Sequence, residues 1–431
     1  MATKHPTNEA QRPGLFTDFD AYRTPVNADY ASVLTKGLVA FDANVLLNLY
    51  RYTQNARSDL LRALEALDSS LFVPHQVLVE FWRNRETTLR ESGSTGAKAV
   101  EEMNGHLTAA TQTLRTWANR VALEETKFEG LKDQLAGTFE QVRQKIDGIG
   151  EGEWKDITHD TSTDPVVVKL EAIFSGRVGP ALDAEDYEAA LKEGMRRVEN
   201  KVPPGYMDRK KEGSGPAGDY LVWEQILKEA GPRACDVLFV TADAKEDWWR
   251  KEHGYNRGPR PELTDELSGR GGGRLLLLTP KRFLEIAAPI FEFSVSEGSV
   301  QDIERVERIE DEETNGGWTT AALRELFDRL TYEGWLDRVS VIKYAASHDG
   351  FVDAETVYEL CEYEDDRTLR GFTKPVTRIS RDLRKEPVSE DAVKVLTTKY
   401  RTGQQRAVGF LVPAVLLPMI REITDGDDDG A

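Results

Sequence analysis

The sequence predicts an α/β fold built on a parallel sheet, followed by a smaller domain of helices and a hairpin. Short apolar runs alternate with helical apolar patterns from residue 38 onward, several of the runs are followed by acidic residues, and a basic amphipathic segment lies near residue 380. A chain of 431 residues is long enough for two domains with separate cores. We expect a polar lead-in (1–37), an α/β domain (38–294), an acidic linker (295–317), a second domain (318–422) and an acidic tail (423–431).

Composition narrows the class of protein. The two cysteines, Cys235 and Cys361, lie far apart and lack the spacing of a zinc site, which favours a reducing compartment. No apolar stretch is long enough for a membrane span and no secretory leader is recognisable, so we expect a cytoplasmic protein with no membrane partner. A net charge of −19 argues against nucleic acid as a partner of the chain as a whole. The basic segment near residue 380 is a local exception.

The elements of the first domain follow from the apolar pattern. Runs rich in Leu, Val and Phe predict strands at 38–42, 71–75, 237–241 and 275–278. Helical spacing predicts helices at 46–67, 76–90, 219–227 and 244–253. Residues 254–274 are rich in Gly and Pro, which predicts a loop at the border of a cleft.

A helical insertion of about residues 91–200 interrupts this domain. Apolar residues keep a spacing of three and four from Val100 to Ile146. We favour an antiparallel helix pair packed on the core, broken near Gly130 or Gly137. An intermolecular coiled coil is the alternative, and through it the insertion would bind a second copy or a protein partner.

Four acids stand where strands end or helices begin. Open α/β sheets bind ligands beyond the carboxyl ends of their strands. Clustered carboxylates repel one another without a cation, and oxygen ligands suit Mg²⁺ or Mn²⁺, which in pairs support phosphodiester hydrolysis. We therefore expect a metal site at these acids, with Asp247 as a further candidate ligand. We also expect Asn44 and Thr241 to form hydrogen bonds with the ligands or with the bound water. The four acids are Asp42, Glu80, Asp219 and Asp243.

Each acid also has a purely structural interpretation. Asp42 and Asp219 could be helix N-caps, and Glu80 could complement a helix dipole in the first turns. Asp247, one turn after Asp243, competes with it for the ligand role. The recurrence of acids at equivalent topological positions favours the metal site over these alternatives.

At these residues the sequence resembles the PIN and PIN-like nuclease family, in particular large bacterial PIN-like domains with a helical insertion. The resemblance covers about residues 35–290 and depends on the order of its motifs. It implies a three-layer α/β/α fold and metal-dependent cleavage of RNA or DNA, RNA being favoured, with Asp42, Glu80, Asp219 and Asp243 as ligands. The matching stretches are 41–51, 73–82, 218–223 and 240–243, and 204–208 is similar to the same subgroup.

The second domain resembles a winged helix-turn-helix domain. Helical patterns around 322–330, 339–346 and 354–361 precede an amphipathic segment at 369–383, in which Pro375 predicts a helix start, and a hairpin at 393–412. Residues 367–406 hold eleven Lys or Arg against four Asp or Glu. This favours nucleic-acid binding, although a solvated face of a protein-interaction module is the alternative. The candidate contacts are Lys374, Arg378, Arg381, Lys385, Lys399, Arg401 and Arg406.

Two functions follow from these observations. We favour a divalent-metal-dependent nuclease with Mg²⁺ or Mn²⁺ as cofactor and nucleic acid as substrate. The alternative is a non-catalytic module that binds nucleic acid or protein through the second domain, with the acids serving as caps. A phosphatase of the haloacid dehalogenase type is disfavoured, because Asn44 stands where that class has its second Asp.

Overall fold

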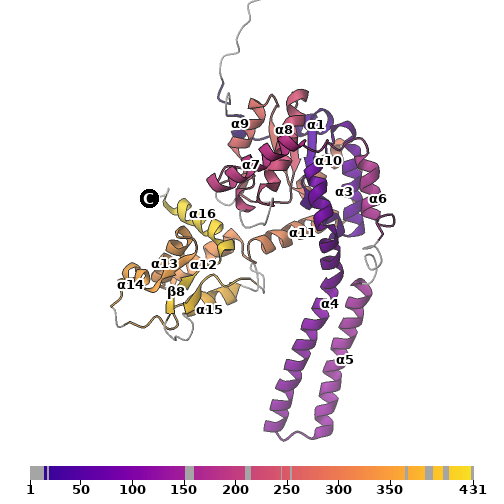
Figure 1. The fold of residues 1–431 in the computed structure, drawn as a ribbon. Helices are drawn as coiled ribbons and strands as arrows, with labels where there is room; N and C mark the ends of the chain where they lie inside the picture. Colours follow the sequence, from indigo (N-terminus) through magenta and orange to yellow (C-terminus); the bar gives the residue numbers. More distant parts are fainter. Residues whose placement is uncertain are drawn as a thin grey trace, which may run out of the picture.

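The chain folds around two separate hydrophobic cores. The structure, a computed structural model, describes residues 14–16, 19–150, 160–208, 215–243, 245–252, 255–364, 367–383, 392–400 and 407–428. The first core draws its buried residues from positions 33 to 306, and the second from positions 318 to 423. Figure 1 shows the second unit, from α12 to α16, beside the first. None of the described helices combines the length and apolar character that a bilayer crossing requires.

A parallel sheet of three strands lies in the first core, as the apolar runs predict. Its order is β1-β2-β5, and Leu38 pairs with Val237, which pairs with Leu275. All residues of the three strands are buried, which explains why their sequences are continuous apolar runs. The run at 71–75 forms two isolated parallel bridges and no longer strand. The strands are β1 (Leu38–Phe41), β2 (Val237–Val240) and β5 (Leu275–Leu278).

The helices that contribute to the first core differ from the prediction in two places. The lead-in contains a helix whose Val33 and Leu34 are buried. The helix predicted at 46–67 is divided, because Thr53 accepts a hydrogen bond from the Ala56 amide and so begins a new helix. The helices are α1 (Asn27–Lys36), α2 (Ala43–Leu47), α3 (Gln54–Ala66), α6 (Pro165–Phe174), α7 (Ala184–Asn200), α8 (Gly218–Arg233) and α10 (Pro280–Ile290).

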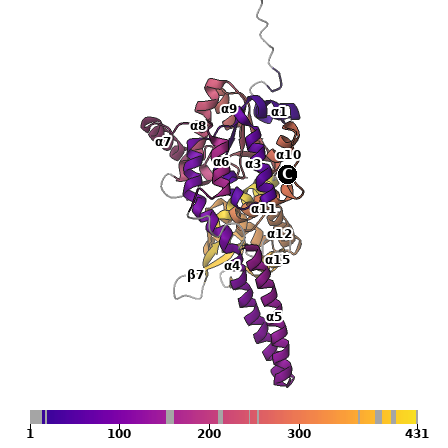
Figure 2. The same cartoon turned by 90° about the vertical axis from the view of Figure 1, so that its right-hand side faces the viewer.

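The insertion forms a two-helix arm. The helix that begins at the first domain continues without a break as α4 (His75–Arg120), and α5 (Glu125–Gly150) returns beside it. Figures 1 and 2 show the arm projecting from the body, so most of its length is not packed on the core as expected. The turn lies between the two helices, and both Gly130 and Gly137 are inside α5. Arg115 ties the pair together by hydrogen bonds of 2.7 and 2.8 Å to Glu125.

Residues 244–274 differ most from the prediction. The helix predicted at 244–253 is absent from its described part, where a turn leads into a strand. Trp249 pairs with Pro259 in an antiparallel hairpin, and this pairing overrides the helix-forming residues before it. The expected loop contains a strand and a helix. These elements are β3 (Trp249–Glu252), β4 (Tyr255–Pro259) and α9 (Pro261–Gly269).

The acidic segment at 295–317 contains α11 (Ser299–Thr314), which packs on the first core. Ile303 and Val306 are buried in that core. On its polar side, Glu310 accepts hydrogen bonds from Asn48 (2.7 Å) and Arg51 (2.8 Å). The acidic residues that suggest a solvated linker therefore make specific contacts with the first unit.

The second unit combines helices with a three-stranded antiparallel sheet of order β6-β8-β7. The sequence did not predict β6, and the helix α16 extends into the segment 423–431 that was expected to be an acidic tail. Pro375 lies in the first turn of α15, as expected. The elements are α12 (Thr320–Tyr332), α13 (Leu336–Ser347), β6 (Phe351–Asp353), α14 (Ala354–Leu360), α15 (Lys374–Leu383), β7 (Thr397–Tyr400), β8 (Ala407–Leu411) and α16 (Leu417–Asp428).

Candidate active site

A hydrogen-bonded chain links the acids that follow β1 and β2. The Thr241 hydroxyl donates to Asp42 Oδ2 at 2.9 Å and accepts from the Asp243 backbone amide at 3.0 Å. Because β1 and β2 are parallel neighbours in register, their carboxyl ends lie together. Thr241 itself is fully buried, so its hydroxyl has a fixed position. It holds Asp42 and the start of the Asp243 turn in one arrangement.

The carboxyl group of Asp42 has an unusual environment. Burial, followed by the charges of Glu80 and Asp243, raises its pKa from 3.8 to about 7, against the opposing effect of the hydrogen bond from Thr241. Asp42 is the N-cap residue of α2, yet its side chain makes no capping hydrogen bond there. Its structural interpretation as a cap is therefore weak, and the three acids act on one another electrostatically.

Glu80 on α4 acts on Asp42 through its charge, whereas Asp219 on α8 lies beside Gly205. Gly218, the first residue of α8, lies so close to Glu80 that a Cβ at this glycine would come within 2.7 Å of Glu80 Oε1. Gln76 donates a hydrogen bond of 3.0 Å to the same oxygen. The Glu80 carboxylate thus lies at the N-terminus of α8, where the helix dipole favours negative charge. Asp219 is the next residue of that helix, inside its first turn and not at its N-cap.

Asp247 has a different position from the other acids. It is fully buried, and its Oδ2 accepts hydrogen bonds from the backbone amides of Gly205 (3.1 Å) and Met207 (3.3 Å). Gly205 has a φ of +89°, and a Cβ there would lie 3.2 Å from the Cβ of Asp219. Asp247 therefore fixes a loop that packs against Asp219.

Lys245 supplies a positive charge at the edge of the site. Its Nζ lies 2.8 Å from Asp243 Oδ2, and its backbone amide donates a 2.9 Å hydrogen bond to Asp243 Oδ1. Both oxygens of Asp243 thus face groups of the same lysine. A cation that approaches Asp243 has to share this carboxylate with the ammonium group.

The acidic site (Asp42, Glu80, Asp219 and Asp243) offers only oxygen ligands, which suit a hard divalent cation. Within the described residues, no three His, Cys, Asp or Glu side chains are grouped closely enough to form a ready cage. Mg²⁺ usually keeps several water ligands and binds proteins through one or two carboxylates. The acids therefore suit a hydrated Mg²⁺ or Mn²⁺ ion, which some of the carboxylates would hold through water.

A comparison with protein families agrees with this geometry. The family described as PIN like domain matches residues 38–263, more than half of the chain. The chain belongs to the PIN-like domain family. No curated protein and no solved structure matches it. The match includes the acidic site, Asp247 and the helical arm, and membership supports a nuclease-type activity on nucleic acid.

Sequence reasoning located the acids of the PIN-like domain but not all of their partners. Asn44 is exposed and makes no hydrogen bond to the acidic site in the described part of the chain, whereas Thr241 does. Lys245 and Gly205 were missed. The motif at 204–208 could have indicated that Gly205 lies near the acids. The position of Lys245, two residues after Asp243, was a weaker indication that it contacts this acid.

The predicted nucleic-acid contacts lie in the second unit. Lys374, Arg381 and Lys399 are exposed, and we call these three the basic surface. Arg378 forms an ion pair with Glu333, and its guanidinium also lies 4.0 Å from Asp382. Lys385, Arg401 and Arg406 lie outside the described residues. The candidates thus differ in their availability to a phosphate, because Arg378 already has acidic partners.

Proposed function

We propose that this PIN-like protein is a divalent-metal-dependent nuclease that hydrolyses phosphodiester bonds, with RNA preferred over DNA. Asp42, Glu80, Asp219 and Asp243 would hold Mg²⁺ or Mn²⁺. The observation that carries the proposal is the raised pKa of Asp42, which burial and then the neighbouring charges of Glu80 and Asp243 bring to about 7. Nothing in the packing of the first core requires carboxylates to be brought together at this cost.

The residues of the chain would each contribute a defined part of the reaction. When bound, the cation would activate water and stabilise the leaving oxygen. Asp42 and Asp243 would bind it from the ends of β1 and β2, with Thr241 restraining the orientation of Asp42. Glu80 and Asp219 would face them from α4 and α8, and Asp247 would keep the Gly205 loop in place against Asp219.

For the overall architecture we propose a three-layer α/β/α arrangement of the first domain and a winged helix in the second. The order α13, β6, α14, α15 and then the hairpin β7-β8 supports the latter. In such a domain α15 would be the recognition helix. The basic surface on α15 and β7 would then help to recruit nucleic acid. We also propose that the arm, on which Trp117 is exposed, binds a second copy or a protein partner.

The alternative function is a non-catalytic module that binds nucleic acid or protein through the second unit. The exposed cations of the basic surface favour it, since they need no metal. The two functions differ in their dependence on divalent ions and on Asp42.

Cleavage of labelled nucleic acids tests the proposal. Purified protein is incubated with single-stranded RNA, duplex RNA and DNA in Mn²⁺, Mg²⁺ or EDTA, beside Asp42→Asn and the control Asp133→Asn on the arm. We expect cutting of RNA that requires the metal, is lost in Asp42→Asn and persists in the control. Binding that survives EDTA without any cutting would favour the non-catalytic alternative.

A further inference from the structure

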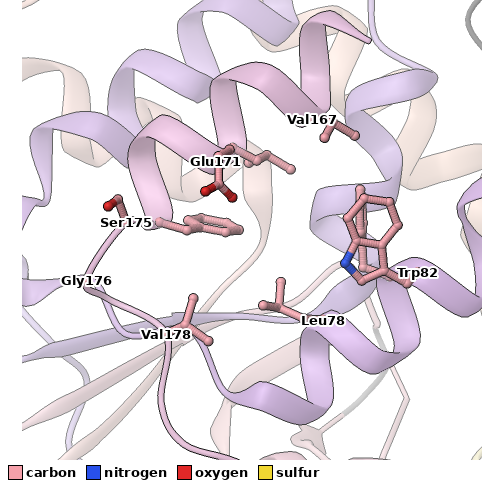
Figure 3. A pocket seen from close by; sticks show the side chains of 10 residues that line it. Leu78, Trp82, Val167, Glu171, Ser175, Gly176 and Val178 are labelled. Atoms are coloured by element: carbon pink, nitrogen blue, oxygen red, sulfur yellow. The ribbon is translucent and has the colours of Figure 1, made fainter. Parts of the chain in front are cut away.

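An apolar pocket of about 300 Å³ lies between α4 and α6, outside the acidic site. Figure 3 shows Trp82 on one side and Ser175 and Glu171 on the other, with Val178 and Leu78 below. Trp82 is 50% exposed and Val178 is 40% exposed. Exposed apolar groups that converge on a cavity mark a binding site more often than a packing defect.

The charge of the pocket restricts its ligand. Glu171 is the only charged side chain among the lining residues, and it makes no hydrogen bond or ion pair with any described residue. No Lys or Arg of the described chain lines the cavity, so a phosphate group would meet a carboxylate and no cation. The complementary ligand is an apolar side chain that lies next to a positive charge. The net charge of −19 favours the same kind of partner over long distances.

Beside the pocket, the isolated parallel bridge between Val73 and Val178 leaves a short backbone edge. Val73 donates its amide to the Arg177 carbonyl (3.0 Å) and accepts from the Gly179 amide (2.9 Å), in a parallel bridge with Val178. Val178 lies between these two partners, so its own N–H and C=O point away from Val73. Within the described residues neither group has a backbone hydrogen-bond partner. An added strand could pair with this edge.

The pocket and the edge are adjacent, because the side chain of Val178 lines the pocket while its backbone forms the edge. Side chains directly opposite on neighbouring strands share one face of a sheet. A residue that pairs beside Val178 would therefore direct its side chain toward Trp82 and Phe174. Main-chain hydrogen bonds would then supply affinity and the pocket would supply specificity.

We propose that this pocket and edge bind an extended segment of a partner protein that carries a large apolar side chain next to Lys or Arg. The apolar side chain would enter between Trp82 and Phe174, the basic residue would face Glu171, and the segment's backbone would pair with Val178. Trp82, which lines the pocket, lies on α4 two residues beyond Glu80, so the partner would contact the helix that carries an acid of the acidic site. The proposal does not depend on metal binding or cleavage.

Selection from a displayed library of random twelve-residue peptides against the full-length protein tests the proposal. We expect enriched peptides to share an aromatic or large aliphatic residue within two positions of Lys or Arg. Their binding, measured by fluorescence anisotropy, should weaken at least tenfold in Trp82→Ala and Val178→Pro. Glu171→Lys changes an exposed residue and should weaken the binding of these peptides without affecting folding.

Two matched controls separate the pocket from exposed apolar side chains in general. Trp117 on the arm is 48% exposed and Val168 on α6 is 50% exposed, and neither lines the pocket. Trp117→Ala and Val168→Ala should bind the selected peptides as the unaltered protein does. Equal binding to all five variants would overturn the proposal. The proposal would also be overturned if Trp82→Ala abolished binding of oligouridylate or dimerisation of the protein. Either result would show that the pocket has another occupant.

Discussion

The acidic site and the basic surface each consist of like charges, yet the surroundings of these charges differ. Asp243 is paired with Lys245 and its side chain is 10% exposed, whereas Arg378, beside the basic surface, is paired with Glu333 and is 45% exposed. Solvent screens charges at an exposed surface, so a solvated basic face costs little. At the acidic site the loss of water around the carboxyl group, followed by the charges of Glu80 and Asp243, raises the pKa of Asp42. A partly buried set of like charges therefore indicates function more strongly than an exposed one.

The largest expected effect is a difference in cleavage rate between substitutions at Asp243 and at Asp247. Asp243→Asn should lower cleavage by at least about 100-fold, since loss of even an indirect partner of a metal typically costs 10- to 100-fold. Asp247→Asn should keep cleavage within about threefold, because an amide oxygen can still accept the Gly205 and Met207 amides. Rates measured under single-turnover conditions check both values. Equal losses in the two variants would make Asp247 a metal ligand.

The second effect concerns stability in metal-free buffer. The pKa of Asp42 is raised from 3.8 to about 7 in the folded state. Between pH 3.8 and pH 7 the carboxyl group is therefore ionised in the unfolded chain but still protonated in the folded one. The folded state consequently loses stability as the pH rises through this range. Asp42→Asn should therefore increase the free energy of unfolding at pH 7.5 by about 1 to 2 kcal/mol, less than the full shift allows because the site can relax. The gain should vanish near pH 4.

Thermal or urea unfolding from pH 4 to 8 measures this gain. Asp133→Asn, on the exposed face of the arm, serves as the control and should show no pH-dependent gain. A gain that is the same at every pH would mean that the substitution acts through packing and not through charge.

A smaller effect is expected for the internal counter-charge of Asp243. Lys245→Met removes an ammonium group that a divalent cation has to displace or share. We expect Mn²⁺ affinity to rise about three- to tenfold, in line with the modest free energy of a partly exposed ion pair. Calorimetric titration with Mn²⁺ checks this. Weaker binding in Lys245→Met would show that the lysine supports the ligands and does not compete for them.

The smallest effects are expected at the basic surface. Lys374→Ala and Arg381→Ala should each weaken nucleic-acid binding severalfold and reduce the salt dependence by about one released ion. Arg378→Ala should matter less, because Glu333 already holds its guanidinium. Glu333→Gln should strengthen binding slightly by releasing Arg378. Anisotropy titrations at several salt concentrations compare the four variants, and an Arg378→Ala loss larger than the other two would reverse this ranking.

The sequence predicted what depends on local pattern. Apolar runs located β1, β2 and β5, and the acids after them identified the candidate site. Features that depend on distant contacts could not be predicted in this way. Glu333 lies 45 residues before Arg378, and the partners of Asp247 lie 40 and 42 residues before it.

Tertiary contacts also overrode local preference in two segments. The hairpin β3-β4 replaced a predicted helix, because strand pairing across Trp249 outweighs the helix propensity of the residues before it. The acidic composition of α11 suggested a linker. Its packing could not be predicted locally, because Ile303 and Val306 are buried against residues that lie far away in the sequence.

Direct binding of Mn²⁺, followed by electron paramagnetic resonance, tests most directly whether the acidic site acts as one unit. The full-length protein is titrated beside Asp42→Asn, Glu80→Gln, Asp219→Asn and Asp243→Asn, with Asp247→Asn as the buried control. We expect saturable binding that each of the four substitutions weakens at least tenfold and that Asp247→Asn leaves nearly unchanged. Absence of binding to the unaltered protein, or equal binding in all variants, would contradict the assignment of these four acids as a metal site.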